Sequence, residues 1–119
     1  MIVEDDGPIR ESLRMILEMD GYTVHEAENG QQALGLLQSG RLPNLIFLDL
    51  MMPVMDGVQF YQTLRKNTEW DPIVAVILSA TGNLKEKLAS LGEPAPPTLK
   101  KPVDLDKIVE ITQKYCPIC

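Results

Sequence analysis

Three carboxylate side chains follow apolar runs in this sequence of 119 residues. Glu4 and Asp5 come directly after Met1–Val3, and Asp49 comes directly after the uninterrupted run 45–48. Neighbouring carboxylates repel each other by roughly 4 kcal/mol at about 4 Å and an effective dielectric constant near 20, so a cluster of them favours a cation. Oxygen ligands with open positions suit Mg²⁺, which keeps several waters and bridges to phosphate. A carboxylate can also be a nucleophile that accepts a phosphoryl group.

A hydroxyl and an amine stand at corresponding places later in the chain. Ser79 ends the apolar run 73–78, and Lys101 follows the short segment 98–100. A hydroxyl can donate a hydrogen bond to phosphoryl oxygens, and an ammonium group can neutralise part of their charge. Together with the carboxylates, these groups suit phosphoryl transfer to an acidic side chain.

The elements that must bring these residues together are strands and helices in alternation. Five strands are expected over residues 1–3, 22–27, 45–48, 73–78 and 98–100. Five helices are expected to begin at Pro8, after Asn29, at Asp56–Gly57, after Thr81 or Asn83, and after Asp104. Such alternation predicts an α/β fold with a parallel, doubly wound sheet. Because the strands then run the same way, the residues that follow them should meet at one edge: Glu4, Asp5, Asp6, Asp49, Ser79 and Lys101.

Other polar residues are expected to have structural roles. Asp6 and Asp56 are predicted helix caps, and His25 is predicted to be a structural residue of the second strand, far from the acidic loops. Cys116 and Cys119 have the spacing of half a redox or zinc site, but no second pair accompanies them. We therefore assign them no function.

Composition narrows the class of protein. The length fits one domain spanning 1–119, with no output domain expected within it. A formal net charge of −6 makes direct nucleic-acid binding unexpected. No apolar run is long enough to span a membrane, and the first residues lack the features of a secretory signal. A cytoplasmic protein is the expectation from these features.

The spacing of these residues resembles that of the receiver domain of two-component response regulators. The resemblance rests on Glu4-Asp5-Asp6, Asp49-Leu50-Met51-Met52-Pro53-Val54-Met55-Asp56-Gly57, Leu78-Ser79-Ala80 and Lys101-Pro102, in that order along almost the whole chain. It implies a flavodoxin-like (βα)5 fold with strand order 2-1-3-4-5. It also implies a signalling domain, not an enzyme acting on a separate substrate, although it would catalyse its own phosphorylation and slow dephosphorylation.

The same resemblance implies a role for each residue of the site. Asp49 would be the phosphoacceptor, and Glu4 with Asp5 the acidic pair. Mg²⁺ would bind at Glu4, Asp5 and Asp49. Its direct ligands would be the side chains of Asp5 and Asp49 and the backbone carbonyl of Met51. Ser79 would be the switch hydroxyl and Lys101 the phosphate-contacting lysine.

The implied partners follow from the family. The phosphoryl donor would be a sensor histidine kinase or a histidine phosphotransfer protein, and an attached or separate output domain would receive the signal. The surface formed by the fourth helix, fifth strand and fifth helix could pair two copies. Thr98 stands where the family often has Tyr or Phe, three residues before the lysine. A conformational switch that depends on the rotamer of an aromatic side chain is therefore not expected.

Three other functions fit parts of the sequence. A flavodoxin-type FMN protein shares the fold, but its phosphate loop is rich in Ser, Thr and Gly, whereas this chain carries Glu4–Asp6 there. A haloacid-dehalogenase-type phosphatase also uses an aspartate nucleophile with Mg²⁺, but it needs an acid where Met51 stands. A docking domain that works without phosphorylation would not need the complete set of groups.

Overall fold

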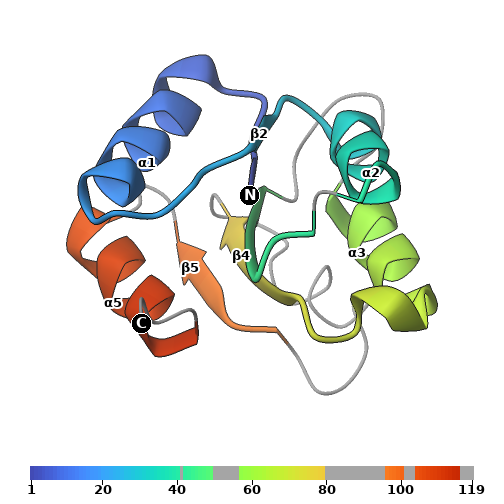
Figure 1. Cartoon of the computed structure of the whole chain (residues 1–119). Coiled ribbons are helices and arrows are strands. Elements are labelled where there is room, and N and C mark those ends of the chain that lie inside the picture. The colour runs from blue at the N-terminus through green and yellow to red at the C-terminus, as the bar shows by residue number, and fades with distance from the viewer. Residues whose placement is uncertain (41, 50–56, 80–95, 101–103, 116–119) are drawn as a thin grey trace.

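A parallel sheet forms the centre of the molecule (Figure 1). The computed structural model describes residues 1–40, 42–49, 57–79, 96–100 and 104–115, without the side chains of residues 79 and 100. Within these ranges the strands are β1 (Ile2–Val3), β2 (Glu26–Ala27), β3 (Leu45–Asp49), β4 (Val74–Ser79) and β5 (Thr98–Lys100). Their order is β2-β1-β3-β4-β5, and every pairing is parallel. The predicted fold class and strand order are confirmed.

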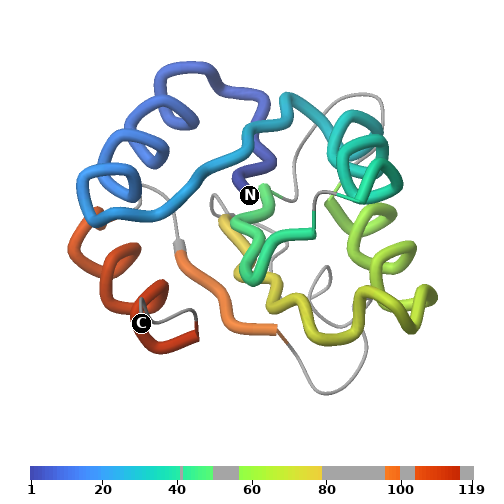
Figure 2. Tube along the Cα trace, in the orientation of Figure 1, coloured from blue at the N-terminus to red at the C-terminus, as the bar shows by residue number. Residues whose placement is uncertain are grey.

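Helices cover both faces of this sheet. They are α1 (Gly7–Met19), α2 (Gly30–Gln38), α3 (Gly57–Lys66) and α5 (Leu105–Tyr115), with a 3₁₀ turn, η1, at Thr68–Trp70. Helices α1 and α5 lie on one face, and α2 and α3 lie on the other, as Figure 1 and the chain trace in Figure 2 show. The helix expected after Thr81 or Asn83 lies outside the described residues. This arrangement is the doubly wound one that alternating strands and helices predict.

The central strand β3 is buried on both faces, as its apolar sequence predicts. Ile46 and Leu48 belong to the core under α2 and α3, whereas Leu45 and Phe47 belong to the core under α1 and α5. Because successive side chains of a strand point to opposite faces, one short segment contributes to both cores. Its last residue, Asp49, is therefore fixed by packing on both sides.

Three of the predicted helix caps are present in the structure. The side chain of Asp6 accepts a hydrogen bond from Ile9 N at 3.1 Å at the start of α1, and Asn29 accepts one from Gln32 N at the start of α2. Asp104 likewise accepts a bond from Asp106 N, 2.9 Å away, where α5 begins. Asp56, the cap expected for α3, lies outside the described residues. Asp6 thus has the structural role expected of it.

The structure differs from the prediction at β2. The predicted second strand covers 22–27, but only Glu26 and Ala27 pair with β1, because β1 itself contributes only Ile2 and Val3 to the ladder. In the first turn of α5, Leu105 is exposed. The buried positions of α5 are Ile108 and Thr112. Where a strand begins and ends depends on the strand that it pairs with, and the periodicity of its own sequence does not contain that information.

Candidate functional site

Three carboxylates meet where β1 and β3 end. Glu4 and Asp5 follow β1, Asp49 is the last residue of β3, and β1 and β3 are direct neighbours in the sheet. One carboxylate oxygen from each residue lies within 4.8 Å of the other two. Glu4 is fully buried and Asp49 is 2% exposed, whereas Asp5 is exposed. The cluster therefore has two acids set into the protein and one facing solvent.

The backbone after β1 is held by hydrogen bonds on both sides. Glu4 N donates to Ala27 O at 3.1 Å, which extends the pairing of β1 with β2 by one residue. Asp6 N donates to Glu4 Oε1 at 3.2 Å, while the Asp6 side chain caps α1. The turn that carries Glu4 and Asp5 is thus connected to both β2 and α1. Among the described acids Asp6 is not part of the cluster, as the sequence predicts.

One further residue, which the sequence does not predict, contacts this turn. Arg10 of α1 donates from Nη1 to the backbone oxygen of Glu4 at 2.8 Å. Helical periodicity places Arg10 on the polar side of α1, which is the usual position of a solvated charge. The signal available in the sequence is its spacing of one helical turn from Asp6, the residue that caps the helix.

The other predicted site residues are only partly covered by the structure. Asp49 pairs with Leu78, so Ser79 is the next residue of the neighbouring strand, and Ser79 in turn pairs with Lys100 of β5. The backbone register therefore brings the ends of β3, β4 and β5 to the same edge of the sheet. Met51, Lys101 and the side chain of Ser79 lie outside the described parts of the chain.

The donor atoms of the acidic cluster fit a hard divalent cation. Carboxylate oxygens are the ligands that Mg²⁺ and Ca²⁺ prefer, and Mg²⁺ needs only a few of them because it retains water. Three acids this close repel each other unless their charge is compensated. The carboxylate of the buried Asp49 can also act as a nucleophile toward an anionic phosphoryl group. Such an attack needs the same compensation of charge.

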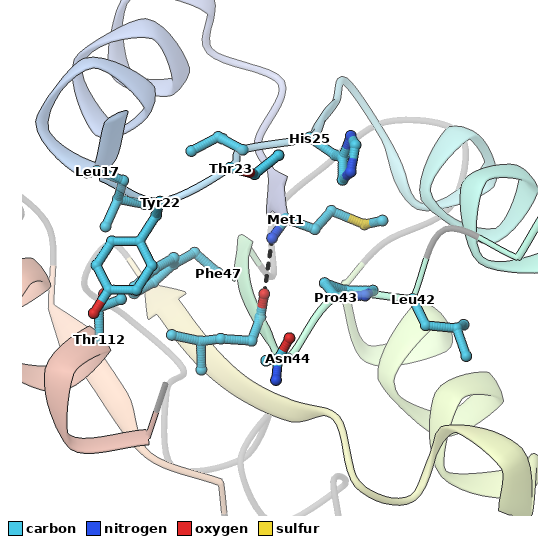
Figure 3. Close-up of a pocket in the computed structure, with 12 residues that line it drawn as sticks. Met1, Leu17, Tyr22, Thr23, His25, Leu42, Pro43, Asn44, Phe47 and Thr112 are labelled. Carbon is cyan, nitrogen blue, oxygen red and sulfur yellow. Dashed lines mark hydrogen bonds between the residues drawn. The ribbon is translucent and has the colours of Figure 1, made fainter. Parts of the chain in front are cut away.

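A separate cavity of about 250 Å³ lies at the opposite end of the strands (Figure 3). Its wall includes Met1, Phe47, Leu17 and His25, and none of the three clustered acids belongs to it. Figure 3 shows the His25 ring at this cavity. Met1 N, also in the cavity wall, donates a hydrogen bond to Leu45 O at 2.8 Å. The cavity is thus not part of the acidic site, and His25 stands apart from that site, as the sequence predicts.

Comparison with known proteins identifies the family. The chain matches the response regulator receiver domain over residues 1–113. It belongs to this family. The receiver domain is 38% identical over 109 residues to the response regulator MprA of Mycolicibacterium vanbaalenii, an alignment covering 92% of this chain and 46% of that protein. The chain therefore spans about half the length of the curated relatives it matches.

Solved structures give the same result. A CheY-like receiver domain protein from Methanospirillum hungatei has a TM-score of 0.84 at 31% identity, covering 97% of this chain and 90% of that one. The receiver domain of a histidine kinase from Syntrophus aciditrophicus has a TM-score of 0.85 at 29% identity, with coverages of 96% and 86%. The chain is thus a phosphoacceptor-type signalling domain of two-component systems. No helix in the described ranges is long and apolar enough to cross a membrane.

Proposed function

We propose that this receiver domain accepts a phosphoryl group on Asp49 and that Mg²⁺, bound at the acidic cluster, is required for the transfer. The observation that carries the proposal is the position of Asp49. It is buried at the carboxyl end of the central strand, and one of its oxygens lies within 4.8 Å of oxygens from Glu4 and Asp5. Packing fixes the nucleophile, and the neighbouring acids supply ligands for the cation.

Each residue has a distinct part in the proposed reaction. An Asp49 carboxylate oxygen attacks phosphorus while the bond between phosphorus and the donor's imidazole nitrogen breaks, and the electron pair of that bond leaves with the imidazole. Asp5 and Asp49, with the Met51 carbonyl, would hold Mg²⁺, and Glu4 completes the acidic cluster. When bound, the cation offsets the charge between carboxylate and phosphoryl group.

Two further side chains are proposed to act on the phosphorylated form. Lys101 would pair with a phosphoryl oxygen, and Ser79 would donate a hydrogen bond to another. The register that sets Ser79 one residue beyond the partner of Asp49 supports this assignment for Ser79. Moving these groups toward the phosphoryl group would shift the population between two conformations of the domain.

The proposed partners are proteins of a phosphorelay. The donor would be a sensor histidine kinase or a histidine phosphotransfer protein, and the recipient of the signal would be an output domain. The MprA relatives are about twice as long as the matched region, which is consistent with an output domain in such proteins. Two copies could pair through the surface that includes β5 and α5. The domain would turn over only its own phosphoryl group.

The experiment that tests this proposal is intact-mass spectrometry after incubation with acetyl phosphate and Mg²⁺. We expect a gain of about 80 Da, the mass of one phosphoryl group. The gain should be absent with excess EDTA and absent in Asp49→Asn. The same gain in Asp49→Asn, or in EDTA, would overturn the assignment of the phosphoacceptor or of the metal requirement.

A further inference from the structure

The guanidinium group of Arg10 contacts three groups from two different segments of the chain. Its Nη1 donates to Glu4 O at 2.8 Å, its Nε lies 3.5 Å from a carboxylate oxygen of Glu26, and its Nη2 lies 3.9 Å from one of Glu28. The Arg10 side chain is only 18% exposed. It is therefore a largely covered charge with a specific set of partners, unlike a typical solvated arginine on a helix surface.

These contacts all lie close to the backbone of Glu4, which belongs to the acidic cluster. Glu26 and Glu28 flank Ala27, whose carbonyl oxygen accepts the hydrogen bond from Glu4 N. Arg10 binds the other end of the same residue, at Glu4 O. The backbone of Glu4 is thus held through its N–H by β2 and through its carbonyl by α1, and the two flanking glutamates hold Arg10 in place.

We propose that Arg10 is a positioning residue for the metal site, acting by fixing the turn that carries Glu4 and Asp5. The inference rests on the proposed function, in which the acidic cluster binds Mg²⁺. Residues that orient metal ligands without touching the metal commonly change affinity about tenfold or more when they are replaced. Arg10 suits this role because its planar group can contact Glu4 O, Glu26 and Glu28 together, which the single ammonium group of lysine cannot.

Charge and geometry predict opposite effects of replacing Arg10. If Arg10 acted only as a nearby positive charge, its loss would leave the acidic cluster more negative and Mg²⁺ would bind more tightly. If Arg10 positions the turn, its loss lets Glu4 and Asp5 move and Mg²⁺ binds more weakly. The two carboxylates paired with Arg10 already compensate most of its charge, so we expect the geometric effect to dominate.

Arg14 provides a matched control on the same helix. It also pairs with Glu26, at 3.5 Å, and it contacts Glu11 and Glu18, but among the described residues it forms no hydrogen bond or ion pair with the turn. Arg10→Gln and Arg14→Gln therefore remove the same charge from the same ion-pair network. Only the first removes the bond to Glu4 O.

The test is Mg²⁺ affinity, measured by calorimetric titration of the purified chain and both variants. We expect Arg10→Gln to weaken binding about tenfold and Arg14→Gln to change it by less than about twofold. Arg10→Lys should restore only part of the affinity, and it replaces Arg10→Gln in the comparison if the latter does not fold. Unchanged or tighter binding in the Arg10 variant, or equal losses in the Arg10 and Arg14 variants, would overturn the inference.

A second measurement separates this inference from the proposed function. Without metal, hydrogen exchange of the Glu4 and Asp6 amides followed by NMR reports whether the turn is held. We expect exchange several-fold faster in Arg10→Gln than in Arg14→Gln. If the wild-type chain binds no Mg²⁺, the proposed metal site fails, whereas faster exchange confined to the Arg10 variant still shows that Arg10 holds the turn. Equal exchange in both variants would refute it.

Discussion

Neighbouring acidic residues of the same turn have different tasks in this domain. Asp6 uses its side chain to cap α1, whereas Asp5, one residue earlier, directs its carboxylate to the cluster with Glu4 and Asp49. An N-cap stabilises a helix by about 1 kcal/mol, whereas carboxylates held close together repel each other. Replacing Asp6 should therefore change mainly the stability of the protein, whereas replacing an acid of the cluster should change metal binding.

We predict that Asp6→Ala lowers the free energy of unfolding by about 1 kcal/mol and leaves Mg²⁺ affinity within about twofold. Asp49→Asn should instead raise the free energy of unfolding without metal, by about 1 kcal/mol, because it removes one buried member of the cluster. Mg²⁺ should then no longer stabilise that variant. Urea denaturation with and without Mg²⁺ measures both effects. Destabilisation of metal-free Asp49→Asn would show that repulsion does not dominate there.

At the scale of elements, the site depends on helices that are held by narrow apolar stripes. In α1 the buried residues are Leu13 and Leu17, which pack in the core shared with α5 and β3. Met15 of the same helix is 53% exposed. The helix that carries Asp6 at its cap and Arg10 in its second turn is thus anchored mainly through one side.

Leu13→Ala should lower the free energy of unfolding by about 2–5 kcal/mol, because it removes buried methyl groups and leaves a cavity. Met15→Ala, two residues along the helix, should change it by less than about 0.5 kcal/mol. Thermal and chemical denaturation of the two variants make the comparison. Similar losses in both would mean that α1 does not pack as the structure shows.

The sequence predicts some elements better than others for physical reasons. Strands β3 and β4 are continuous apolar runs, because both of their faces are covered, and such runs are distinctive. The length of β2 depends on how many residues β1 offers for pairing, which is a property of the fold. The clustered acids could be predicted because parallel strands end at one edge. The Arg10 contact could not, because periodicity assigns a side of a helix and not a partner.

At the scale of the whole molecule, the domain connects a buried nucleophile to strands on the far side of the sheet. Asp49 pairs with Leu78, and Leu78 pairs with Leu99 of β5. Leu78 and Ile108 of α5 share one core, with Leu99 packed against it. A change at Asp49 can therefore reach β5 and α5 through two backbone pairings and a continuous packed core.

We predict that phosphorylation changes amide NMR shifts along β5 and α5 as well as in the turns beside Asp49. A difference of a few kcal/mol in contacts between the two states is enough to move most molecules from one to the other. Asp49→Asn treated with the same phosphodonor and Mg²⁺ is the control. Shifts confined to residues next to Asp49 would argue that this domain is phosphorylated without a distant conformational change.

The central claim is that the phosphoryl group is covalently attached to the carboxylate of Asp49. Borohydride reduces an acyl phosphate but not a free carboxylate, so the phosphorylated residue becomes homoserine. Tandem mass spectrometry of the protease-digested protein then locates this residue. We predict homoserine at position 49 after treatment with phosphodonor and Mg²⁺, and none when EDTA is present. Homoserine at position 5, at position 6 or at any other aspartate, with position 49 unmodified, would contradict the account.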